Sequence, residues 1–160
     1  MRAVFRAPMR SRRDDVPRHA AVARALAQGL VGVGGRLSSP PGSLEDAVTA
    51  VAGEYDERVA RRLRRFASAP EGSWVWTRDS EDSYWLGRLT GPWRYDSSRE
   101  AHEVDLVHVR PCLWLDAPVP ERMVPPAVQA TFARGGRNWQ QTHDTDASRI
   151  SANIWPDREA

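Results

Sequence analysis

The sequence of 160 residues contains no lysine, a single cysteine and no long hydrophobic run. All 23 basic residues are arginine, which excludes enzymes that depend on a P-loop lysine or a Schiff-base lysine. Because Cys112 stands alone, an intramolecular disulfide and a cysteine-based zinc cluster are excluded, and we expect a reducing, cytoplasmic environment. The absence of about 18 consecutive apolar residues, and of an apolar signal-peptide core, predicts neither a transmembrane helix nor secretion.

The composition is that of a globular protein, with 41% hydrophobic and 28% charged residues. A chain of this length predicts a single domain with its own hydrophobic core. The charge is distributed unevenly, because residues 1–70 hold 13 arginines against 7 acidic residues, whereas residues 71–160 hold 10 against 14. This asymmetry favours a polyanionic partner that contacts one face.

Hydrophobic periodicity divides the chain into a helical first part and a strand-rich second part near Gly72. Helices are predicted at residues 17–28, 43–53, 54–66 and 127–132. Strands are predicted at 4–9, 30–34, 74–78, 84–90, 104–110, with a continuation past Pro111 at 113–115, and 138–143. The clearest helix, 54–66, has Tyr55, Val59, Leu63 and Phe66 on its inner side. We therefore expect one α+β domain over residues 1–143, followed by a C-terminal tail, residues 144–160. Its strands should close into a small curved antiparallel barrel with helices 17–28 and 54–66 packed outside.

The sequence contains no recognisable set of catalytic residues and no recognisable metal site. The four histidines, His19, His102, His108 and His143, lack the spacings of metal ligands. We interpret His108, which lies among valines on a predicted strand, as a hydrogen-bonded core histidine. There is no GxSxG nucleophile elbow. We therefore expect a protein that is not an enzyme and has no cofactor.

The aromatic and basic residues are the candidates for binding. Most of the seven tryptophans should fill the barrel, but Trp93 and Tyr95 follow a Gly-Pro bend and share one side of an extended segment. A nucleic-acid base between two such rings would gain roughly 1–3 kcal/mol from stacking. The arginines gather in three groups, each of which has a structural alternative as an ordinary solvated face or turn: residues 10–13, 58–65 and 134–137.

Several motifs occur in an order that resembles a known family. They are the glycine-rich strand at 29–35, the Arg-Phe helix end at 65–66, and the segments 72–77, 84–95 (YWLGRLTGPWRY) and 108–114 (HVRPCLW). Together they resemble the EVE-like, PUA-superfamily reader domains of modification-dependent restriction endonucleases and prokaryotic defence proteins, which are similar to YTH and ASCH domains. The resemblance covers roughly residues 1–143. It departs at Gly35, where related domains often have a tryptophan.

The resemblance implies an SH3/PUA-like barrel and a reader that flips a modified base into an aromatic pocket. The expected partner is nucleic acid, DNA rather than RNA, and no membrane is expected. Because no nuclease or ATPase segment is recognised, the effector in a restriction or antiviral defence system should be a separate protein. The predicted nucleic-acid-binding residues are Trp76, Arg88, Trp93, Arg94, Tyr95, Arg110, Trp114, Arg134, Arg137 and Trp139.

Two other functions remain open at this point. Exposed tryptophan and arginine side chains are also favoured at protein interfaces, so the domain could be a protein-interaction module. Salt distinguishes the two functions, because binding to nucleic acid weakens steeply as the salt concentration rises. A small enzyme of nucleotide metabolism is the third possibility, and it lacks a recognisable catalytic set.

Overall fold

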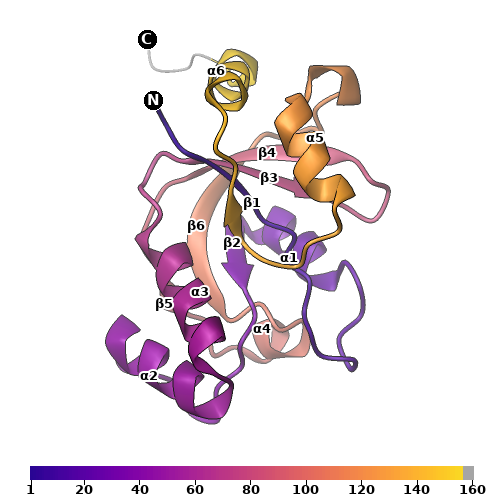
Figure 1. Ribbon diagram of the computed structural model, residues 1–160. Helices are drawn as coiled ribbons and strands as arrows, with labels where there is room; N and C mark the ends of the chain where they lie inside the picture. The colour runs from indigo at the N-terminus through magenta and orange to yellow at the C-terminus, as the bar shows by residue number, and fades with distance from the viewer. Residues whose placement is uncertain (157–160) are drawn as a thin grey trace.

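The computed structural model describes residues 1–156 as an α+β fold built on one strongly curved sheet (Figure 1). The sheet has seven strands in the order β2-β6-β4-β3-β1-β7, with β5 paired to β6. The strands are β1 (Val4–Arg6), β2 (Leu30–Val33), β3 (Trp74–Arg78), β4 (Tyr84–Leu89), β5 (Arg94–Tyr95), β6 (His108–Trp114) and β7 (Gln140–Gln141). The helices are α1 (Ala20–Gln28), α2 (Leu44–Glu54), α3 (Glu57–Ser68), α4 (Arg99–Glu103), α5 (Pro126–Ala133) and α6 (Thr145–Ile154), with a 3-10 turn at Glu121–Met123.

The predicted strands at 74–78 and 84–90 are confirmed, and they form a hairpin. Strands β3 and β4 pair antiparallel from Trp74 opposite Arg88 to Arg78 opposite Tyr84. The Asp79 carboxylate shapes the turn by accepting hydrogen bonds from two backbone N–H groups within it, at 2.9 and 3.0 Å. Side chains alternate across β3, so the period of two in the sequence places them on opposite faces of the sheet.

The sheet differs from the predicted barrel because strands from the N-terminal part of the chain join it. Strand β1 pairs with β3 in parallel, and β2 pairs antiparallel with the first half of β6. The second half of β6 pairs with β4, so this long strand connects the two parts of the curved sheet. The result is a curled, mixed sheet that is mostly antiparallel. This topology agrees with the expected small curved sheet, but it does not identify an SH3/PUA-like barrel specifically.

Helix α3 is amphipathic as predicted, but it begins at Glu57, later than the predicted start at residue 54. It begins after Asp56, whose carboxylate accepts a hydrogen bond from the Val59 N–H at 2.9 Å. Leu63 and Phe66 are buried against the sheet. Tyr55 instead ends α2 and is 39% exposed, which corrects its assignment to the inner side of the helix.

Hydrophobic cores lie on both faces of the sheet. On one face, Val75 and Val31 pack with residues of α1, α2 and α3. On the other face, Trp74 and Trp76 pack with α5 and with Ala147 of α6. Helix α6 corrects the expected C-terminal tail, because residues 145–154 are helical and contribute to this second core. The last part of that predicted tail, residues 157–160, lies outside the described residues.

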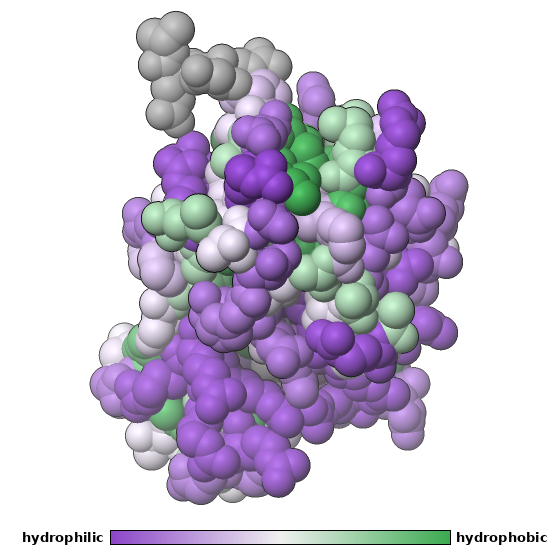
Figure 2. Space-filling model, turned by 45° about the horizontal axis from the view of Figure 1, so that its top comes forward, coloured by the Kyte–Doolittle hydropathy of each residue, from purple (hydrophilic) through white to green (hydrophobic). Residues whose placement is uncertain are grey.

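The surface is largely hydrophilic on the face shown in Figure 2, and hydrophobic residues gather in the upper part of that view. Among residues 1–156, no helix has the length and hydropathy that crossing a membrane requires.

Candidate functional site

A pocket of about 130 Å³ opens between the segment that follows β1, the end of β2 and helix α3. Its lining consists of residues 7–13, 32–35 and 137–139 together with Val51, Tyr55, Val59, Arg62, Leu63 and Asp105. It combines apolar side chains, glycine backbone and arginines. Its volume is close to the roughly 150 Å³ of an apolar cavity that accepts benzene, and the pocket is open to solvent.

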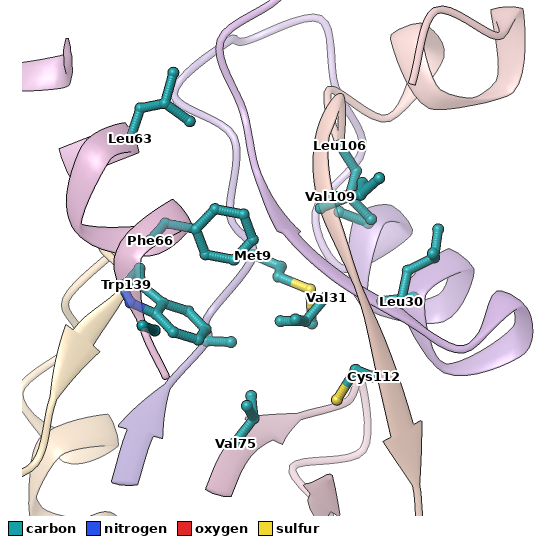
Figure 3. Packing of buried hydrophobic residues seen from close by; sticks show 14 of the residues in the cluster. Met9, Leu30, Val31, Leu63, Phe66, Val75, Leu106, Val109, Cys112 and Trp139 are labelled. Atoms are coloured by element: carbon teal, nitrogen blue, oxygen red, sulfur yellow. The ribbon is translucent and has the colours of Figure 1, made fainter. Parts of the chain in front are cut away.

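Two aromatic residues line the pocket in different ways. Trp139 is held in the core, because its ring stacks on Phe5 at 4.7 Å and meets the edge of Phe66 at 4.9 Å (Figure 3). Only 8% of Trp139 is exposed. Tyr55 is more exposed, and its hydroxyl donates a hydrogen bond of 2.6 Å to the Arg36 carbonyl. The pocket therefore has one fixed aromatic wall and one aromatic side chain at the surface.

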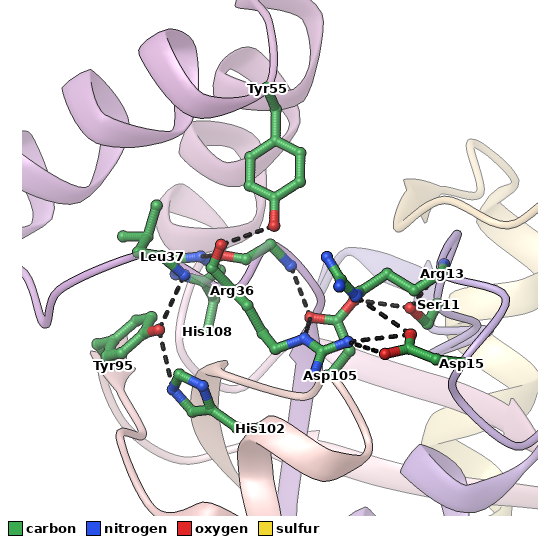
Figure 4. A network of polar contacts seen from close by, with 11 residues as sticks. Ser11, Arg13, Asp15, Arg36, Leu37, Tyr55, Tyr95, His102, Asp105 and His108 are labelled. Carbon is green, nitrogen blue, oxygen red and sulfur yellow. Dashed lines mark hydrogen bonds and ion pairs between the residues drawn. The ribbon is translucent and has the colours of Figure 1, made fainter.

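A buried carboxylate, Asp105, also lines the pocket. It belongs to the network of polar contacts drawn in Figure 4. One oxygen accepts a hydrogen bond from the Gly35 N–H at 3.0 Å, and the other accepts one from the Ser11 hydroxyl at 2.7 Å. The Arg36 Nε lies 4.0 Å away, which compensates part of the negative charge without a hydrogen bond. Asp105 thereby ties the segment after β1 to the end of β2.

Gly35 is held from its other side by His108. The His108 Nε2 and the Gly35 carbonyl oxygen are 3.0 Å apart, and the Trp93 indole N–H donates to His108 Nδ1 at 3.2 Å. Since Nδ1 accepts, Nε2 carries the proton and donates to Gly35. Burial lowers the pKa of His108 from 6.5 to about 4, so the ring is neutral at pH 7. The φ of Gly35, 121°, is a conformation that favours glycine.

Arginines surround the mouth of the pocket. A second hollow of about 230 Å³ shares residues 9–13 and Arg137 with the first and adds Arg18 and His19 to its lining. Partial burial is the main cause that lowers the pKa of the Arg10 guanidinium. The nearby positive charges of Arg18 and Arg137 lower this pKa further. Within residues 1–156, Arg10, Arg18 and Arg137 have no carboxylate at ion-pair distance. Their charges are therefore free for an anionic ligand.

The loop that carries Arg137 rests on a buried arginine. The Arg6 guanidinium donates to the backbone carbonyl and hydroxyl of Thr131 at 2.8 and 2.9 Å, and to the Asn138 carbonyl at 3.1 Å. Gly136 lies so close to Arg6 that a Cβ at this position would collide with the guanidinium. Arg6 therefore positions the turn that connects the exposed Arg134 to Arg137 in the pocket lining.

The structure brings only two of the predicted site residues, Arg137 and Trp139, into the pocket. Trp76 and Arg110 are buried, which contradicts their assignment to a binding surface. The Trp76 indole donates to Ser151 at 3.1 Å, and the Arg110 guanidinium donates to three backbone carbonyls at 2.7–3.0 Å. Their polar groups are therefore satisfied within the core.

The predicted slot between Trp93 and Tyr95 is filled by the protein itself. The His108 ring stacks against Trp93 at 6.2 Å and meets Tyr95 edge to face at 5.3 Å. Both aromatic residues are half-buried, whereas Arg94 is exposed, so the predicted alternation along this segment is confirmed. The interpretation of His108 as a hydrogen-bonded core residue is confirmed as well.

The other two predicted residues belong to the curved sheet. Arg88 and Trp114 are half-buried on β4 and β6, and the Trp114 indole donates to the Leu30 carbonyl at 2.8 Å. The residues that sequence reasoning missed at the pocket are Ser11, Gly35, Tyr55 and Asp105, whereas Arg62 belongs to the arginine group 58–65. The cluster of arginines at residues 10–13 was the signal that pointed to this location.

Comparison with known proteins finds a distant similarity to a solved structure. No protein-family model matches the sequence, and no curated protein matches it either. The YTH domain of the Zygosaccharomyces rouxii MRB1 protein, solved in complex with N6-methyladenosine RNA, is similar over 95% of this chain and 86% of that chain. The sequence identity is 13% and the TM-score is 0.46. At this level of similarity, a functional argument depends on the pocket and its charges.

Proposed function

We propose that the protein is a non-catalytic nucleic-acid reader that takes one base into the pocket of about 130 Å³. The observation that carries this proposal is the continuity of the apolar pocket with the arginine-lined hollow, since the two share residues 9–13 and Arg137. A nucleotide has the same two parts, a flat apolar ring and an anionic phosphate. Aromatic walls and nearby cations are the features that bind unstacked bases in other proteins.

The finer parts of the proposal come from the sequence resemblance. We propose DNA as the nucleic acid, a base that carries a modification, and a restriction or defence role with a separate nuclease or ATPase as effector. The predicted site residues Arg94, Arg134 and Arg88 are proposed as additional contacts to the phosphate backbone. Trp93 and Tyr95 have a different proposed role, which is to support Gly35 through His108.

The protein-interaction alternative has less support. None of the seven tryptophans is fully exposed, and the exposed large hydrophobic residues among the described ones are Met1, Tyr55, Leu113 and Met123. A tryptophan-centred interface would need such a side chain at the surface.

The test is a titration of labelled DNA and RNA oligonucleotides, with and without modified bases, at several salt concentrations. Arg137→Ala should weaken binding to all sequences and reduce the slope of log K against log salt by about 0.7–0.9. Arg122→Ala, which removes an exposed arginine outside both hollows, is the matched control and should leave the slope unchanged. The proposal is wrong if the wild type binds no oligonucleotide at low salt, or if both variants behave alike.

A further inference from the structure

A negatively charged side chain is unexpected in a site whose other charges suit phosphate. Asp105 is 6% exposed and lies in the wall of the pocket, whose other charged lining residues are arginines. A carboxylate there repels phosphate, so it contributes nothing to binding the backbone of a nucleic acid. Its position in the pocket wall instead makes it available to the ring that enters the pocket.

The local backbone is built around this carboxylate. Asp105 has a φ of 50°, a left-handed conformation that few residues with side chains adopt. A Cβ on Gly34 would lie 2.6 Å from an Asp105 carboxylate oxygen, so the glycine leaves the space that the carboxylate occupies. The surrounding contacts therefore hold the Asp105 side chain in one position.

The hydrogen bonds of Asp105 leave one acceptor position on each oxygen. An ionised carboxylate has about four lone-pair positions, two on each oxygen. The Gly35 N–H uses one position on the first oxygen, and the Ser11 hydroxyl uses one on the second. Arg36, at 4.0 Å, is beyond hydrogen-bond distance. Two neighbouring N–H donors on a ligand could therefore pair with the two oxygens, as an arginine fork does.

From this arrangement we infer that Asp105 selects guanine, the base whose ring edge presents two adjacent donors, N1–H and N2–H. Adenine and cytosine present an amino group beside a ring nitrogen that accepts, and thymine and uracil present one N–H between two carbonyl oxygens. Each of these edges would place an acceptor against a carboxylate oxygen, which is repulsive. The inference rests on the proposed function, because it names the base that enters the same pocket.

The experiment compares single-stranded oligonucleotides that differ at one central base. The bases are guanine, hypoxanthine, 2-aminopurine, adenine, cytosine and thymine. Hypoxanthine lacks the amino donor and 2-aminopurine lacks N1–H, so both remove half of the proposed pair. We expect guanine to bind at least about tenfold more tightly than either analogue, which is the discrimination of a good bidentate contact. Equal binding of guanine and both analogues to the wild-type protein would by itself overturn the inference.

Two substitutions assign the preference to Asp105. Asp105→Asn keeps the size of the side chain and an acceptor for Gly35, but replaces one oxygen with a donor, so the preference for guanine should fall to less than about threefold. Asp116→Asn makes the same change of charge at an exposed position outside both hollows and should retain the preference. Melting temperatures establish that both variants are folded at the temperature of the assay.

The outcomes separate this inference from the proposed function. If Asp105→Asn weakens all six oligonucleotides equally, the carboxylate only holds Ser11 and Gly35 together and the inference is wrong. Retention of the guanine preference in that variant would also contradict it. If no oligonucleotide binds the wild type, the proposed function itself fails. Binding of all oligonucleotides with the expected salt slope but no base preference would leave the reader proposal standing and refute guanine selection.

Discussion

The buried imidazole of His108 should make the stability of this protein depend on pH in a specific way. His108 has a pKa of about 4 in the folded protein and a reference value of 6.5, because burial disfavours its charged form. In the unfolded chain the ring takes up a proton near pH 6.5, whereas in the folded protein it does not. Protonation of His108 in the unfolded chain therefore leaves the free energy of unfolding unchanged above about pH 6.5. It lowers this free energy as the pH falls from 6.5 toward 4.

The size of the loss follows from the two pKa values. One pKa unit corresponds to about 1.4 kcal/mol, so the whole loss is about 3 kcal/mol, of which about 2 kcal/mol is reached at pH 5. Carboxylates with lowered pKa values, such as that of Asp96, lose their contribution at more acidic pH. A measurement at pH 5 and pH 8 therefore isolates most of the histidine effect.

The assay is urea unfolding of the wild type and of His108→Gln at these two pH values. Glutamine cannot ionise, and its amide N–H₂ can still donate to the Gly35 carbonyl that Nε2 contacts. The variant should be less stable than the wild type at pH 8, because the Trp93 indole loses its acceptor. Its loss between pH 8 and pH 5 should be about 2 kcal/mol smaller. An equal loss in both proteins would refute the assignment of the effect to His108.

Two further predictions concern stability. Leu63→Ala should lower the free energy of unfolding by about 2–5 kcal/mol because it leaves a cavity under α3, whereas Arg61→Ala on the exposed side should change it by less than about 0.5 kcal/mol, as measured by chemical denaturation. Arg110→Met should cost more than about 2 kcal/mol, since it leaves three backbone carbonyls without their donor, and equal stability of variant and wild type in thermal melts would contradict this account.

One chain of hydrogen bonds connects the buried His108 to the wall of the pocket. Trp93 donates to His108, His108 donates to Gly35, and the Gly35 N–H donates to Asp105. A substitution at Trp93 should therefore alter the pocket indirectly, although its ring does not line it. The Trp93 segment, which the sequence indicates as a binding element, is therefore expected to act on the pocket through His108 and Gly35.

Local sequence was sufficient for several elements of this protein. The period of helix α3, the alternation of the β3–β4 hairpin and the glycine-rich β2 strand are all visible in the order of residues, because each depends on contacts between near neighbours. The core position of His108 could be predicted for the same reason, from the valines beside it. The cationic cluster at residues 10–13 could also be recognised, because its charges are adjacent in the chain.

Tertiary structure alone decided which residues form the pocket. Val4 pairs with Trp74, so β1 leads the arginine segment to the end of β2 across a parallel pairing that has no signal in the local pattern. The same packing buries Arg110 against three carbonyls and places Asp105 beside Ser11, 94 positions away. Which residues contact each other depends on which strands and helices pack together. Whether a given side chain is exposed or buried therefore depends on tertiary packing.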